Sequence, residues 1–175
     1  MLRALTTISI ILLTLVITPN ISSADYKLYP IDNVYNAPFP DQPTFVGEIG
    51  QGKGKHRSYQ YSDDTNIISY SATYQVNSDS FKTKDIHKII KKYIDGVIIG
   101  SGGKLLSTQP ADFNGYKGIK YVSEKNYDGV IAKKHGIVIF KNDRFHMWSV
   151  SDFQNKSKES AERVFNFYYK YITIN

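Results

Sequence analysis

Residues 66–76 read NIISYSATYQV and have the pattern of a β-strand with two unlike faces. Successive side chains of a strand point to opposite sides of a sheet, so alternate residues share a face. The segment therefore predicts a sheet with one covered face and one face rich in hydroxyl groups. The apolar set is Ile68, Tyr70, Ala72, Tyr74 and Val76, and the intervening set is Ile67, Ser69, Ser71, Thr73 and Gln75.

The next segment changes from a strand period to a helix period. Apolar residues fall at helical spacing, and lysines occupy the opposite face, which predicts an amphipathic helix. We expect Thr83 to cap its N-terminus and Asp85 to favour the positive end of the helix dipole. Glycines at 100, 102 and 103 end the pattern. The apolar stripe consists of Ile86, Ile89, Ile90, Tyr93, Ile94 and Val97.

The remaining segments are mostly strand-like. Asn114-Gly115 predicts a tight turn, and Asn142-Asp143 the turn of a long hairpin in which Phe140 faces Phe145. A second amphipathic helix is expected over Ser157–Ile172, with Ser157 as its N-cap. Residues 25–43 are expected to be an extended lead-in with a short strand at 35–37. Further strands are expected at 44–48, 57–62, 104–108, 118–125, 129–141 and 144–152.

The order of these elements predicts the fold class. Strands joined mainly by hairpins, with only two helices, indicate an α+β protein: an antiparallel β-sheet with two amphipathic helices packed on it. Residues 25–175 are enough for one well-buried domain and too few for two. We therefore expect a single domain over that range.

Three stretches, in this order, resemble the PsbP-like/Mog1-like superfamily. They are Phe39-Pro-Asp-Gln-Pro43, Phe113-Asn-Gly-Tyr-Lys-Gly118, and the pair 145–150 and 161–165. The likeness covers roughly residues 37–174 and departs at Phe167-Tyr-Tyr-Lys170, where relatives often have an aromatic-x-Ser-Phe element. It implies α/β/α layers, work through protein partners, and no shared catalytic centre.

The first 24 residues have the features of a cleavable signal peptide. Arg3 precedes an apolar run of about 13 residues, Leu5–Ile17, which is shorter than the roughly 20 residues of a membrane-spanning helix. Small residues at 22–24 offer a cleavage site before Asp25. We expect export to the periplasm or beyond the cell and no membrane-spanning segment in the mature chain. An uncleaved N-terminal anchor is the alternative.

Composition narrows the chemistry. The chain has no cysteine, which excludes disulfides, thiolate zinc sites and a cysteine nucleophile. The formal charge is +6, and loss of Arg3 leaves 21 basic against 16 acidic residues, or +5. A positive balance permits contact with an anionic surface. It is equally typical of a solvated, lysine-rich surface.

The sequence contains no complete catalytic or cofactor-binding motif. Gly47–Lys53 resembles a P-loop, but Gly54 stands where Ser or Thr should bind magnesium. No Gly-x-Ser-x-Gly elbow occurs, and the four histidines lack metal-ligand spacing. In the predicted hairpin His146 lies near Ile139 and far from His135. We expect no cofactor, no metal site and no nucleic-acid binding, for which stacking aromatics at recognised spacing are missing.

Two basic clusters remain as a candidate binding site. Lys53, Lys55, His56 and Arg57 surround the first hairpin, and Lys133 and Lys134 lie in a later one. If the hairpin ends gather, these residues form a patch for an anionic ligand, although strand alternation separates Lys133 from Lys134. Lysines on edge strands also discourage aggregation without any ligand.

These observations favour an exported, non-enzymatic binding or assembly-factor domain of the cell envelope, with another protein as partner. The alternatives are a carrier for a small apolar or anionic ligand, and a hydrolase with a dispersed catalytic centre.

Overall fold

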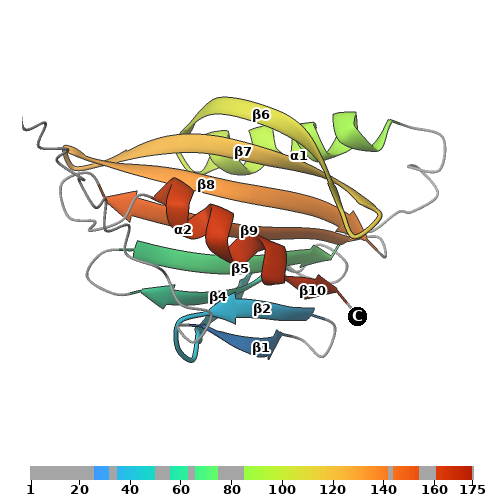
Figure 1. Ribbon diagram of the computed structural model, residues 1–175. Coiled ribbons are helices and arrows are strands. Elements are labelled where there is room, and N and C mark those ends of the chain that lie inside the picture. Colours follow the sequence, from blue (N-terminus) through green and yellow to red (C-terminus); the bar gives the residue numbers. More distant parts are fainter. Residues whose placement is uncertain are drawn as a thin grey trace, which may run out of the picture.

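A seven-stranded antiparallel sheet in the order β3-β4-β5-β9-β8-β7-β6 forms the centre of the fold (Figure 1). The computed structural model describes residues 26–31, 35–49, 56–62, 66–74, 85–141, 144–153 and 161–174. The predicted signal peptide, Thr83 and Ser157 lie outside this part of the chain. The strands are β3 (Thr44–Ile49), β4 (His56–Ser62), β5 (Asn66–Tyr74), β6 (Lys104–Phe113), β7 (Tyr116–Tyr127), β8 (Val130–Lys141) and β9 (Arg144–Phe153).

Tight turns set the register of the long hairpins. Asn114 and Gly115 have φ of 50° and 80°, so both central residues of the β6–β7 turn are left-handed, as a type I′ turn requires. Asp128-Gly129 makes a turn of the same kind between β7 and β8, with φ of 50° and 91°. This turn was not predicted from the sequence. The β8–β9 register pairs Phe140 with Phe145, as predicted.

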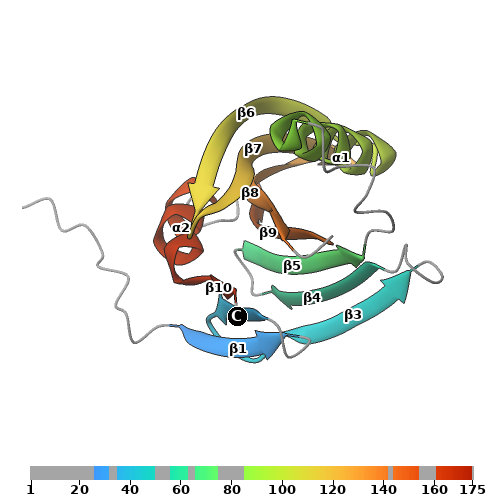
Figure 2. The same cartoon turned by 90° about the vertical axis from the view of Figure 1, so that its right-hand side faces the viewer.

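The two helices lie on opposite faces of the sheet (Figure 2). Helix α1 (Ile86–Gly100) packs on β6, β7 and β8, and α2 (Ala161–Tyr168) packs on β8 and β9. Alternate residues of β8 join different cores, because Val138 packs with the α1 side while Ile137 and Ile139 pack with the α2 side. The predicted α+β class, with two amphipathic helices on an antiparallel sheet, is confirmed.

Helix α1 begins two residues later than predicted. Asp85 is its N-cap, and its carboxylate accepts a hydrogen bond from the backbone N–H of His87 at 3.0 Å. The prediction of Thr83 was therefore wrong. The fully buried residues of the helix are Ile90, Ile94 and Ile98, so its apolar stripe extends one turn past Val97.

Helix α2 ends earlier than predicted. Its described part runs from Ala161 to Tyr168, and a 3₁₀ turn over Tyr169–Tyr171 follows, so Ile172 is already extended. The expected core stripe is correct, because Ala161, Val164, Phe165, Tyr168 and Ile172 are all buried.

The N-terminal segment forms more regular structure than the expected lead-in. Strands β1 (Lys27–Ile31), β2 (Tyr35–Phe39) and β10 (Thr173–Ile174) make a second sheet in the order β1-β2-β10. Pro30 and Pro38 hid this pairing in the sequence, because proline is depleted in strands. Ile31, Ala37 and Phe39 are buried in the core on the α2 side.

Strand β6 also exceeds its predicted range, continuing from Thr108 to Phe113 through Pro110. It is the last strand of the sheet, where proline is tolerated because its missing N–H leaves no ladder bond unmade. None of the described helices is long and apolar enough to cross a membrane.

Candidate functional site

On the α1 side of the sheet, polar residues follow the buried core residues along the same strand. Helix α1 covers Ile119 and Tyr121 of β7, and the next residues on the same face, Ser123, Lys125 and Tyr127, continue past the end of the helix. The sheet curves so that this face is concave (Figure 2). Polar residues therefore line a recess beside the C-terminal end of α1.

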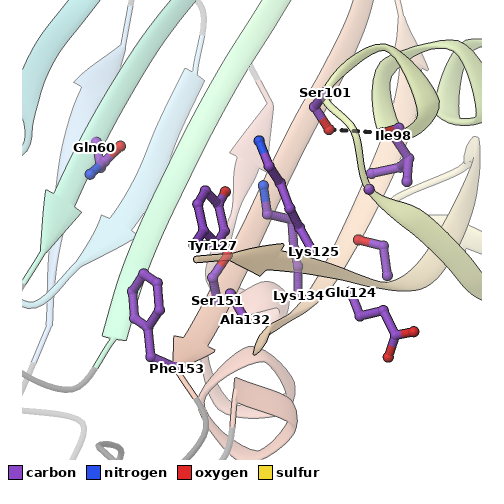
Figure 3. Close-up of a pocket in the computed structure, with 12 residues that line it drawn as sticks. Gln60, Ile98, Ser101, Glu124, Lys125, Tyr127, Ala132, Lys134, Ser151 and Phe153 are labelled. Atoms are coloured by element: carbon purple, nitrogen blue, oxygen red, sulfur yellow. Dashed lines mark hydrogen bonds between the residues drawn. The ribbon is translucent and has the colours of Figure 1, made fainter. Parts of the chain in front are cut away.

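A pocket of about 170 Å³ occupies this recess. Figure 3 shows it between β4, the strands β7–β9 and the loop that follows α1. A row of three residues crosses its floor, since Ser123 of β7 pairs with Lys134 of β8, and Lys134 pairs with Ser151 of β9. Lys125 and Gln60 complete what we call the lysine pocket, defined by Gln60, Ser123, Lys125, Lys134 and Ser151.

Lys125 and Lys134 place two ammonium groups in the same recess. Their side chains run side by side in Figure 3 and point in the same direction. Burial, together with the nearby charge of Lys125, lowers the pKa of Lys134. Within the described residues neither lysine forms an ion pair, and the Lys125 ammonium lies over the face of the Tyr127 ring, 4.6 Å from its centre.

Nearby negative groups do not balance these charges. Glu124 borders the pocket, but its carboxylate points away from the lysines and pairs with Lys104 at 3.5 Å. The C-terminal end of α1 carries a partial negative charge of about half an elementary charge. Its carbonyls at Ile98 and Ile99 already accept hydrogen bonds from the backbone N–H groups of Gly103 and Gly102. Two positive charges therefore exceed the partial charge of the helix end.

Three exposed apolar side chains lie on the elements that line the lysine pocket. Ile99, in the last turn of α1, is 70% exposed. Tyr127 and Val130, paired at the end of the β7–β8 hairpin, are 47% and 38% exposed. Positive charge bordered by exposed apolar surface is a composition suited to contact with another molecule.

Among the described residues of the predicted basic patch, the structure places Lys134 on the opposite face of the sheet from Arg57 and Lys133. Lys53 and Lys55 lie outside the described residues, as does the side chain of His56. Arg57 donates to the carboxylate of Glu48 at 2.5 Å and shares its face of β4 with Tyr59 and Tyr61, which pack on the α2 side. Arg57 and Lys134 are therefore on opposite faces of the sheet.

Lys133 and Lys134 also face opposite ways. Lys133 is exposed on the α2 side, where its cross-strand neighbours are Glu124 and Asp152. Of the six predicted binding residues, the structure places Lys134 in the pocket. The sequence analysis did not predict Ser123, Lys125 or Ser151 as site residues. The available signal was their spacing: polar residues two positions apart on β7 and β9 share one face, as the hydroxyl-bearing residues of 66–76 do.

The two buried histidines of the sheet, His135 and His146, lie apart from each other. His135 pairs with Val150 and His146 with Ile139, so four positions separate them along β8 and β9. Burial lowers the pKa of both, to about 4 for His146. Within the described residues no group of three or more histidine and acidic side chains gathers.

A second, more open groove of about 410 Å³ lies on the opposite face, between α2 and β6. Glu162, His135 and Gln109 line it, and Lys120 lies 3.9 Å from the centre of the Tyr169 ring. Acidic, basic and amide groups are mixed there, and the one lysine is already engaged with an aromatic ring. This groove has no excess of one charge.

Comparison with known proteins identifies the fold. No family model and no curated protein sequence matches the chain. The solution structure of cyanobacterial PsbP (CyanoP) from Synechocystis sp. PCC 6803 matches with a TM-score of 0.62 and 12% identity, over 89% of this chain and 96% of that one. A Pseudomonas aeruginosa protein of unknown function, described as a putative regulator, matches with a TM-score of 0.43 and 9% identity, over 75% and 85%. The chain has a PsbP-like fold, as its sequence predicted.

Proposed function

We propose that the chain is an exported, non-enzymatic binding protein that docks on an acidic partner protein in the cell envelope. The observation that carries the proposal is the uncompensated positive charge of Lys125 and Lys134 in a recess of the sheet. The partner's carboxylates would supply the charge that the described chain does not, and complementary charge speeds association and selects partners. The PsbP-like fold is compatible with a binding role, which fold alone does not establish.

The surroundings of the pocket support a protein as the partner. Tyr127 lines the pocket, and Ile99 and Val130 are exposed on the same helix and hairpin. Tyrosine is enriched at protein interfaces because its ring buries apolar area while its hydroxyl group can still bond to water. A pocket of about 170 Å³ is smaller than the 300–1,000 Å³ that ligand sites usually enclose. A whole small molecule fits this surface less well than a protein side chain does.

Capture from envelope extract tests the proposal. The protein, expressed from the full chain, is immobilised, and bound proteins are identified by mass spectrometry beside a denatured bait. We expect one stoichiometric partner that the double variant Lys125→Glu/Lys134→Glu loses. Lys133→Glu is the matched control, because it changes the same charge on the neighbouring residue but on the opposite face.

A partner that binds both variants equally would place the contact elsewhere on the molecule. Capture of no partner by the native bait would overturn the proposed function and favour the small-ligand carrier.

A further inference from the structure

We propose that the lysine pocket holds a single oxyanionic group, a carboxylate or a phosphate, between the ammonium groups of Lys125 and Lys134. The inference rests on the proposed function in placing the partner's contact at this pocket. It goes further in naming the chemical group that is recognised and the side chains that hold it.

The arrangement of donors is the first argument. Ser123 and Ser151 flank Lys134 on its two neighbouring strands, all on one face of the sheet. Both serines are buried, and neither hydroxyl forms a hydrogen bond within the described residues. The pocket therefore offers an anion one ammonium group from Lys134 and two hydroxyl donors from the neighbouring strands, and hydrogen bonds assisted by charge are the strong ones.

Charge is the second argument. Two like charges in one recess repel, and removing an ammonium group from water adds a further cost. An anion bound between the two lysines offsets both the repulsion and the desolvation cost, because each lysine gains an opposite charge at short range. The lowered pKa of Lys134 supports this reasoning, since an anion would favour its protonated form.

Size is the third argument. Liquid water occupies about 30 Å³ per molecule, so a pocket of about 170 Å³ has room for roughly five water molecules. That space accommodates one carboxylate or one phosphate with its remaining waters. A nucleotide, a sugar chain or a lipid tail would extend beyond this space into solvent.

Titration with small anions tests the proposal without any partner. Sodium phosphate and N-acetyl-aspartate amide are added to the protein at constant ionic strength, with chloride as the reference salt. We expect a saturable rise in the pKa of Lys134, followed through the ¹³C shift of its ε-carbon, and a matching rise in thermal stability. Lys125→Met should abolish the change in the pKa, and Lys133→Met should leave it intact.

The two probes distinguish the source of the group. Stronger binding of the aspartate derivative points to an acidic side chain of a protein, and stronger binding of phosphate points to a free ion; both support an oxyanion site. The absence of a saturable response, or one that Lys125→Met retains, would overturn the inference.

The inference and the proposed function can fail separately. Suppose that Lys125→Glu/Lys134→Glu loses the captured partner but the native protein does not respond to the small anions. This result would support the proposed function and contradict the oxyanion site. Saturable anion binding by a protein that captures no partner would support the oxyanion site and contradict the proposed function.

Discussion

The ring of Tyr121 fills the space that a side chain at position 136 would need. An ideal Cβ on Gly136 would overlap Cζ of Tyr121 and lie 2.5 Å from its hydroxyl oxygen. The two residues are direct partners in the β7–β8 register, so the tyrosine lies across the glycine of the neighbouring strand. Burial raises the pKa of this tyrosine, which is 2% exposed and belongs to the core beneath α1.

Gly136→Ala should therefore destabilise the protein. The added methyl group forces the Tyr121 ring out of its place, and overpacking of this kind costs about 1–3 kcal/mol. Urea unfolding followed by tryptophan fluorescence measures the change. Gly96→Ala is the matched control, because Gly96 is an exposed residue inside α1 with open space around it, where alanine gains about 0.5–1 kcal/mol. Equal effects of the two alanines would contradict the packing described here.

The N-cap of α1 gives a second prediction. Asp85→Ala removes the carboxylate that accepts the backbone N–H of His87, and should cost about 1 kcal/mol. Asp85→Asn keeps an acceptor oxygen and should cost only a few tenths of that. Asp95→Ala is the control on the same helix, since its pair with Lys91 is on the surface and exposed pairs contribute about 0.5 kcal/mol or less. Thermal unfolding that ranks Asp95→Ala above Asp85→Ala would contradict this assignment.

A third prediction concerns the start of α2. Asp152 of β9 accepts a hydrogen bond from the backbone N–H of Ala161 at 2.7 Å, and so ties the helix to the sheet. Asp152→Ala leaves that buried donor unpaired and should cost about 1–3 kcal/mol. Trp148 is the single tryptophan and lies 5.5 Å from Phe165 of α2, ring to ring. Its fluorescence should shift if α2 loosens, whereas Asp152→Asn, which keeps an oxygen acceptor, should show little change.

Periodic patterns explain why so much of the fold was predictable. The alternation over 118–125 and the Phe140–Phe145 pairing depend on neighbours in sequence, and the structure confirms both. The hydrogen bond that joins α2 to the sheet could not be found in that way, because Asp152 lies nine residues before its partner Ala161, on another element. The small sheet was missed for a similar reason, since β2 gains its second neighbour from β10 at the far end of the chain.

The lysine pocket was only partly predictable. Lys134 stood out as part of a basic pair, but its partners Ser123 and Ser151 come from two other strands and meet it only through the sheet register. Charge clusters along the sequence pointed instead to Arg57, whose charge Glu48 already balances. A search for residues sharing a face, rather than for basic runs, would have favoured Lys125.

The pH dependence of stability provides a fourth prediction. Burial lowers the pKa of His146 to about 4, below the value of about 6.5 in the unfolded chain. The unfolded state therefore binds more protons as the pH falls, and stability decreases between about pH 6.5 and pH 4, by up to roughly 3 kcal/mol. His146→Gln should flatten this part of the stability curve in urea titrations at successive pH values. An unchanged slope would show that other groups dominate.

The last prediction is that the lysine pocket lowers the stability of the fold. Burial and the charge of Lys125 both oppose the protonated form of Lys134, so this lysine carries a cost in the folded state that it does not carry in the unfolded chain. The unfolded chain holds this proton more tightly, so stability should rise with pH as the folded protein releases it below the unfolded value of 10.5. Lys134→Met should remove that rise and stabilise the protein at pH 7 by about 0.5–2 kcal/mol, as substitutions that relieve a functional site commonly do.

Lys133→Met is the control for this comparison, because Lys133 lies exposed beside Glu124 and Asp152 and its loss should change stability by less than about 0.5 kcal/mol. Chemical unfolding at pH 7 and pH 9 separates the two variants. A lysine kept only for solubility should be neutral at either position, because a solvated ammonium group costs the fold nothing. A gain in stability at Lys134 alone would mean that the chain retains an unfavourable charge in its pocket, which a bound anion would explain. A loss at Lys134, or equal effects at both positions, would contradict that account.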